Sequence, residues 1–267
     1  PGQEDGPAAL AWYEIGDALN DPVSELKMAR LYESGLGVAP ERERALGLAE
    51  AAAAHGSVEA MTFVANRYLS EGREMDKGVE LLKRAADNRS MSALRLLART
   101  EGGAFTGKAD FDAMNATLDR ALAMPAPSVL VLADKADALL EGRGQPVDRE
   151  GAKALYERVA AFGTPEADFE YGMFLLRQGR DRAEAERRIA KAAEGGHPLA
   201  MAELSETLRC TGMPSAATSV EDWRQRAAAA GSSAAMRRLG QAKIDRDEVE
   251  NGRTWLEQAA LQGDRLS

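Results

Sequence analysis

The chain has 267 residues, of which 45% are hydrophobic and 5% aromatic, and 43 acidic residues against 34 basic ones give a formal net charge of −9. This balance argues against a non-specific nucleic-acid binder and against adhesion to an anionic lipid surface, because both need clustered positive charge. The single cysteine, Cys210, excludes an internal disulfide, and the sequence has no run of 18 or more apolar residues of the kind that spans a bilayer.

An internal repeat runs along almost the whole sequence. Units aligned on the residue that ends each alanine-rich segment begin at Asn20, Gly56, Arg89, Pro127, Gly163, Gly196 and Gly231, with an eighth start at Gly263. The steps between these starts range from 32 to 38 residues. A period of this length is typical of solenoids, in which each unit buries its apolar face against its neighbours.

Each unit predicts a pair of helices. The first helix has large apolar residues at helical spacing, and a small residue in the same stripe lets the two helices approach closely. The second helix is rich in alanine and ends at the next glycine or its substitute. The predicted small residues are Ala29, Ala65, Ala98, Ala136, Gly172, Ser205 and Gly240.

In chain order, residues 9–20 predict the second helix of a repeat that starts upstream, and residues 263–267 predict the start of another first helix. We therefore expect a fragment of a longer protein. The best-formed loops are ESGLGVAPERERA at 33–45 and EGRGQPVDREGA at 141–152, where glycines end the first helix and Val38 or Val147 is expected to fill the turn. The unit that begins at Arg89 has the least regular pattern.

This pattern resembles the Sel-one-like repeat family, which is related to tetratricopeptide repeats. The resemblance is carried by YESGLGV and AAAAHG within residues 20–56, by the loop and second helix of residues 127–163, and by Trp12 at the family's tryptophan place. It implies an all-α, right-handed superhelical solenoid of antiparallel helix pairs. It also implies one continuous array over residues 1–267.

The residues that carry chemistry in enzymes do not form a constellation in this sequence. His55 and His197, the two histidines, stand four units apart, and Cys210 has no histidine near it in sequence. The glycine-rich stretches at 35–37 and 142–144 follow a predicted helix, whereas a phosphate-binding loop follows a strand. We predict no catalytic residue, no metal site and no cofactor, and a hydrolase remains a remote alternative.

By analogy with tetratricopeptide repeats, the first helices should line a concave groove that binds a partner protein. Two groups stand out among the groove positions. The first is a basic stretch that could bind carboxylates, formed by Arg30, Arg95 and Arg99 with Asn66 between them. The second is an exposed apolar patch that could bind apolar side chains, formed by Phe169, Met173 and Leu176. The other interpretation, that these are ordinary solvated arginines and half-buried apolar side chains, stays open. The predicted partner-binding residues are Arg30, Asn66, Arg95, Arg99, Phe169, Met173, Leu176 and Arg209.

The resemblance favours a noncatalytic scaffold that binds other proteins. Bacterial members of the family lead us to expect a role in an envelope assembly, such as exopolysaccharide secretion or cell-pole or cell-wall organisation, in the periplasm. The alternative is a cytosolic or secreted regulator that sequesters a signalling partner. Neither hypothesis involves nucleic acid, and neither requires this part of the chain to insert into a membrane.

Overall fold

The computed structural model describes the backbone of residues 6–179, 181–211 and 220–263, and the side chains of residues 9–179, 181–206 and 221–260. Every regular element in these ranges is an α-helix, which confirms the predicted all-α class. None of the described helices is long and apolar enough to cross a membrane. The helices are α1 (Gly6–Asp17), α2 (Pro22–Ser34), α3 (Arg42–Ala54), α4 (Val58–Glu71), α5 (Met75–Asp87), α6 (Met91–Glu101), α7 (Phe111–Leu122), α8 (Val129–Glu141), α9 (Arg149–Ala160), α10 (Pro165–Gln178), α11 (Arg182–Glu194), α12 (Pro198–Thr211), α13 (Val220–Ala229), α14 (Ser233–Ile244) and α15 (Val249–Gly263).

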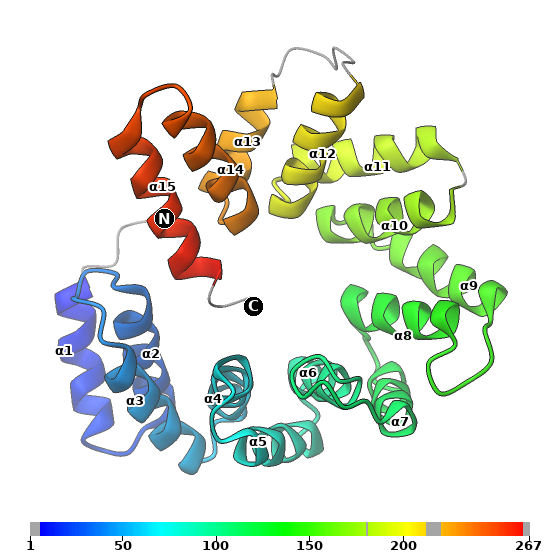
Figure 1. Cartoon of the computed structure of the whole chain (residues 1–267). Helices are drawn as coiled ribbons and strands as arrows, with labels where there is room; N and C mark the ends of the chain where they lie inside the picture. Colours follow the sequence, from blue (N-terminus) through cyan, green and yellow to red (C-terminus); the bar gives the residue numbers. More distant parts are fainter. Residues whose placement is uncertain (1–5, 180, 212–219, 264–267) are drawn as a thin grey trace. The chain divides into compact units, whose positions relative to one another are not determined.

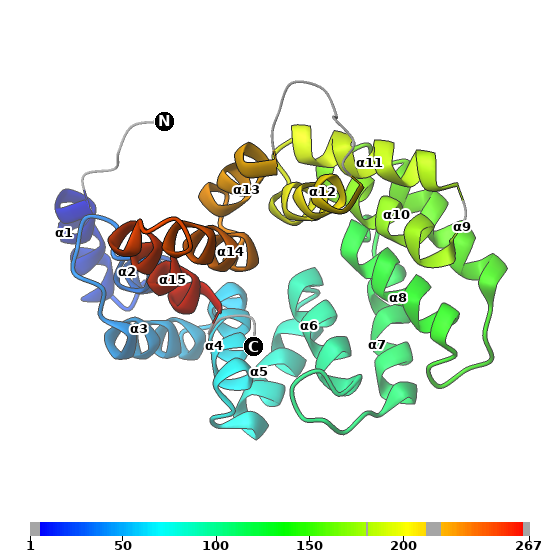
Figure 2. The same cartoon turned by 45° about the horizontal axis from the view of Figure 1, so that its top comes forward.

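The helices pair as the repeat predicts. Each even-numbered helix from α2 to α14 is the first helix of a repeat and packs against the odd-numbered second helix that follows it. The contacts divide the chain into two compact units, Pro1–Pro127 with α1 to α7 and Ser128–Ser267 with α8 to α15. In unit 1, α4 contacts α6, and Figures 1 and 2 show these two first helices side by side. The continuous array over residues 1–267 stays a prediction.

The small residues predicted in the first-helix stripe form the seam between the two helices of each repeat. Ala29, Ala65, Ala98 and Ala136 are at most 1% exposed, and so is Ser205. The remaining two, Gly172 and Gly240, are buried as well. A methyl group or less at this place lets the second helix pack directly against the first, so the predicted seam is confirmed in all seven repeats.

Side-chain caps begin the first helices. Each cap accepts a hydrogen bond from a backbone N–H in the first helical turn, and one such bond is typically worth about 1 kcal/mol. The cap of α12 is His197, whose Nδ1 lies 3.2 Å from the backbone nitrogen of Ala200. The other caps are Asp21, Ser57, Ser90, Ser128, Thr164 and Ser232.

The loops after α2 and α8 differ in how their valines pack. Gly35 and Gly142 end the two helices in the left-handed conformation, as predicted. Val38 packs against the buried cluster that contains Met28, which confirms its predicted role. Val147 is 54% exposed, so the same prediction is wrong for the second loop. Its side chain lies over Gly142, which offers no apolar side chain to cover it.

Arg89 stands where most repeats have glycine, and it is strained there. Its φ is 60°, whereas the equivalent Gly56 and Gly196 adopt φ of 95° and 93° without steric cost. We expect Arg89→Gly to stabilise the protein by about 0.5–1 kcal/mol. The change removes the steric cost of a left-handed arginine, and part of that gain is offset because glycine loses more backbone entropy on folding. Urea unfolding should therefore show a higher midpoint. The reverse change, Gly56→Arg, should lower the midpoint, and equal midpoints for all three proteins would contradict the assignment of strain.

Candidate partner-binding surface

The four polar residues predicted to line the groove in unit 1 lie on three consecutive first helices. Arg30 lies on α2, Asn66 on α4, and Arg95 and Arg99 on α6. Arg30, Asn66 and Arg99 are exposed, and Arg95 is half-buried. An ion pair between Arg30 and Glu59 joins α2 to α4, and α4 in turn contacts α6. The structure therefore places all four on neighbouring helices of one unit.

Carboxylates of the same helices already neutralise part of this basic stretch. Besides the Arg30–Glu59 pair, Arg67 on α4 donates from Nη1 to both carboxylate oxygens of Glu33, at 2.8 and 2.9 Å, and from Nε to Glu71. Burial alone would lower the pKa of Arg67, but the two glutamates outweigh burial and raise it. The Arg30–Glu59 and Arg67–Glu33 pairs tie α2 to α4, and two further arginines lie on α6.

Helix α6 presents an arginine beside an aromatic ring. The guanidinium carbon of Arg99 lies 5.9 Å from the ring centroid of Phe105, which is half-buried in the loop after α6. Arg95 lies one turn earlier on the same helix. A guanidinium within about 6 Å of a ring centroid is attracted to the face of the ring, and the N–H groups of an arginine can donate two hydrogen bonds to one carboxylate. This end of the surface is suited to acidic side chains.

The exposed apolar patch predicted in unit 2 is not exposed as expected. Phe169 is only 9% exposed, and its ring stacks on His197 with centroids 4.6 Å apart. Met173 and Leu176 are half-buried and pack against the same core cluster. The three residues fill the space between successive repeats, which is why little of their surface remains for a partner. The side chain of Arg209 lies outside the described residues.

A buried tyrosine links three helices of unit 2. Tyr156 on α9 donates to Asp137 Oδ1 on α8 at 2.7 Å and stacks on Phe174 of α10, with centroids 4.2 Å apart. Arg177 of α10 donates to both oxygens of Asp137, at 2.9 and 3.1 Å, and to the tyrosine oxygen at 2.7 Å. Burial and then Asp137 raise the pKa of Tyr156, so the phenol stays protonated. The sequence alone contains no sign of this contact, because Asp137 and Arg177 are 40 residues apart and belong to different repeats.

Two buried carboxylates occupy a place that is apolar in the other repeats. Glu25 and Asp168 are 2% and 1% exposed. His55 Nδ1 lies 2.8 Å from Glu25, while Arg188 and Lys191 lie 2.7 and 2.6 Å from Asp168. Burial would raise the pKa of Asp168, but the bonds from Lys191 and Arg188 outweigh it and hold the pKa below its ordinary value. The equivalent residues elsewhere are Met61, Leu94, Leu132, Met201 and Met236.

The described residues hold no group of three or more His, Cys, Asp or Glu side chains that could bind a metal ion. Each histidine has a structural contact. His55 pairs with Glu25, and His197 caps α12 and stacks on Phe169. Burial lowers the pKa of His197, which favours the neutral ring that capping requires. The side chain of Cys210 lies outside the described residues.

The sequence matches no protein-family model and no curated protein. Solved structures do match. A protective antigen present in uropathogenic Escherichia coli strains, which displays a Sel1-like repeat fold, superposes with a TM-score of 0.55 at 19% identity over 95% of this chain and 56% of that one. A Sel1 repeat protein from Oxalobacter formigenes gives 0.52 at 22% identity over 96% of this chain and 78% of that one. The chain has the Sel1-like repeat fold.

A third structure with the Sel1-like repeat fold covers a smaller part of the chain. It is a Sel1 repeat protein from Klebsiella pneumoniae subsp. pneumoniae, with a TM-score of 0.50 at 19% identity over 76% of this chain and 99% of that one. The chain spans just over half the length of the Escherichia coli antigen. At these identities the Sel1-like repeat comparison establishes the fold, and the site residues named above rest on the geometry of this chain alone.

Proposed function

We propose that the chain is a noncatalytic protein-interaction scaffold, and that the first-helix surface of unit 1 binds an acidic segment of a partner protein. The observation that carries this proposal is Arg99, which is exposed on α6 one turn after Arg95 and has its guanidinium carbon 5.9 Å from the ring centroid of Phe105. Arginine edges of this kind recognise carboxylates in forked geometry. The Sel1-like repeat fold supports the proposal, because stacked helix pairs present long surfaces suited to peptide segments.

A double charge reversal tests the proposed surface. We expect Arg95→Glu with Arg99→Glu to weaken partner binding at least tenfold, which corresponds to about 1.4 kcal/mol, because two attractions become repulsions. The melting curve of the double variant is recorded alongside, and the variant should remain folded at the temperature of the binding assay, because Arg99 is exposed and Arg95 half-buried. The partner is first identified by crosslinking and mass spectrometry in the native organism, and affinities are then measured with the purified pair.

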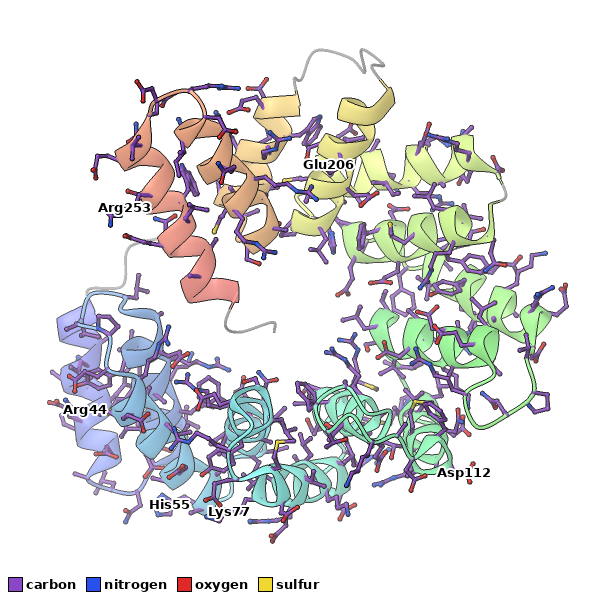
Figure 3. All side chains as sticks on the ribbon, in the orientation of Figure 1. Arg44, His55, Lys77, Asp112, Glu206 and Arg253 are labelled. Atoms are coloured by element: carbon purple, nitrogen blue, oxygen red, sulfur yellow. The ribbon has the colours of Figure 1, made fainter. Side chains whose placement is uncertain are left out.

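The matched control reverses the charge of two basic residues on a second helix of the same unit. Lys77 and Arg84 are exposed on α5, and Figure 3 labels Lys77 on the side of that helix away from α4 and α6. Lys77→Glu with Arg84→Glu makes the same change in net charge and should leave the affinity unchanged. If both double variants weakened partner binding equally, the loss of affinity would come from the change in net charge alone. That result would refute a specific basic surface.

We propose further that the scaffold works in a bacterial envelope assembly, with the periplasm as its location. The support is the fold and its bacterial neighbours, one of which is a protective antigen. The test is fractionation of the native cells, with the chain detected by antibody in periplasmic, membrane and cytosolic fractions. Recovery in the cytosolic fraction alone would reject this location and favour the regulator that sequesters a signalling partner.

A further inference from the structure

A row of exposed polar side chains crosses the first helices of unit 1. Arg30 on α2, Asn66 on α4 and Arg99 on α6 are all exposed, and each directly follows the small seam residue of its helix. Ion pairs join α2 to α4, and α4 contacts α6, so the three helices lie in that order in unit 1 (Figure 1). The row therefore places one arginine on each side of an asparagine. The seam residues are Ala29, Ala65 and Ala98.

The chemistry of the row changes in the next two repeats. The equivalent residue of α8 is Asp137, to which Arg177 and Tyr156 donate hydrogen bonds. The equivalent residue of α10 is Met173, which packs against a core cluster. Neither side chain can donate a hydrogen bond to a partner. The row of donors is thus three helices long, which limits the length of the segment that it can bind.

The two arginines of the row differ in what they contact. Arg99 lies beside the ring of Phe105, whereas Arg30 is paired with Glu59 of α4. The side chains of Arg30 and Glu59 are 45% and 65% exposed, and an ion pair between groups this exposed contributes little net stability. A partner carboxylate that accepts two hydrogen bonds from Arg30 can therefore take the place of Glu59. Glu59 is then an internal competitor for this arginine.

The other charges shared by α2 and α4 are held more tightly. The side chains of Arg67 and Glu33 are 15% and 16% exposed, and Arg67 also binds Glu71. Because Arg67 already donates three hydrogen bonds to two carboxylates, it has little to gain from a third carboxylate. It also offsets the negative charge that these two glutamates would present to an acidic partner. Within the row, Arg30 and Arg99 are therefore the anchors that a partner can use.

The distance between the two anchors sets the form of the bound segment. Packed helices lie about 8–10 Å apart, so the two steps from α2 to α6 span about 20 Å. An extended chain covers this span in about six residues, and a helix in about thirteen. Asn66 favours the extended form, because its amide can pair with the donor and acceptor of a free peptide group, whereas the peptide groups of a helix already bind each other.

We propose that the acidic segment of the partner crosses α2, α4 and α6 in extended form, with one carboxylate on Arg99, another about six residues away on Arg30, and a peptide group on Asn66. The carboxylate on Arg30 replaces Glu59, which is exposed and turns to water. This binding mode rests on the function proposed above, and it specifies the conformation of the segment, the spacing of its acidic residues and the internal competitor.

Two fluorescein-labelled peptides of our own design test the spacing with the full chain. They have the same composition, but two glutamates stand at the predicted spacing in the first peptide and side by side in the second. We expect the spaced peptide to bind wild type about tenfold more tightly at low ionic strength, because it alone can reach both arginines. Arg30→Gln and Arg99→Gln should each remove most of this advantage. Equal binding of the two peptides, or binding of neither, would overturn the proposal.

Glu59→Gln tests the competition for Arg30. Because it frees this arginine from an exposed ion pair, the affinity for the spaced peptide should rise about two- to fivefold. The same change made together with Arg30→Gln should have little effect. The matched control, Glu80→Gln, removes the same charge from an exposed residue of the second helix α5 and should leave the affinity unchanged. An equal rise with and without Arg30, or an equal rise in the control, would show general repulsion and refute the competition.

The native partner separates this binding mode from the function on which it rests. Suppose that Arg95→Glu with Arg99→Glu weakens binding of the partner while Arg30→Gln leaves it unchanged. The basic surface would then stand, and the extended row would be overturned. If the double reversal left the affinity for the partner unchanged, the proposed function would fail, and the binding mode would fail with it.

Discussion

Gly252→Ala is expected to destabilise the last repeat by about 2–3 kcal/mol, because α14 and α15 touch through their backbones there. A Cβ on Gly252 would lie 2.6 Å from the carbonyl oxygen of Gly240, and 2.6 and 3.1 Å from Cγ1 and the backbone nitrogen of Ile244. No side-chain rotation relieves contact with backbone atoms, so the helices must separate. Gly240→Ala should act similarly, since its Cβ would lie 2.8 Å from the carbonyl oxygen of Gly252.

Urea unfolding followed by tryptophan fluorescence measures this loss, because Trp255 lies on α15. In a repeat protein the weakened unit can open before the rest, so an early transition is expected in addition to a lower midpoint. The control is Gly47→Ala on α3, where a Cβ would meet nothing within 4 Å. It should stabilise the protein by up to about 1 kcal/mol through helix propensity. If Gly252→Ala changed the free energy of unfolding in the same way as Gly47→Ala, α14 and α15 would have room between them that the structure does not show.

The repeat register was predictable because it depends on residues that act locally. Glycine and asparagine at Gly56 and Asn20 end helices, and the small residues around Ala65 set the distance between two helices that follow each other in the chain. These features recur at a fixed period, so each unit supports the assignment of the others. Val147 shows the limit: the sequence placed it correctly in the turn but did not show that no apolar side chain faces it.

The candidate site was predictable only in part because side chains from different repeats compete for the same surface. Arg30 was predicted to line the groove, but its ion pair with Glu59 depends on the distance between α2 and α4. Phe169 looked exposed by register, yet His197 of the next repeat covers its ring.

The buried carboxylate Asp168 leads to an asymmetric prediction. Arg188→Ala should cost about 2 kcal/mol, because it leaves a carboxylate that is 1% exposed with Lys191 as its remaining charged partner. Asp168→Met should change stability by less than about 1 kcal/mol, because Met61 and Met201 occupy the same place, Arg188 keeps its bond to Glu184, and Lys191 is exposed. Thermal unfolding of the two variants tests the order. A larger loss for Asp168→Met would mean that the ion pairs themselves hold α10 against α11.

The pH dependence of the same pair can be derived from the direction of the pKa. The pKa of Asp168 is lower in the folded protein than in the unfolded chain, because Lys191 and Arg188 outweigh its burial. Its ionised form therefore stabilises the fold fully above the unfolded pKa of about 4, and that stability is lost as the pH falls through the folded pKa. Between about pH 5 and pH 2, the urea midpoint of wild type should fall more steeply than that of Asp168→Met. Other carboxylates titrate in both proteins, so the difference between the two curves isolates Asp168, and parallel curves would show that its charge contributes nothing to folding.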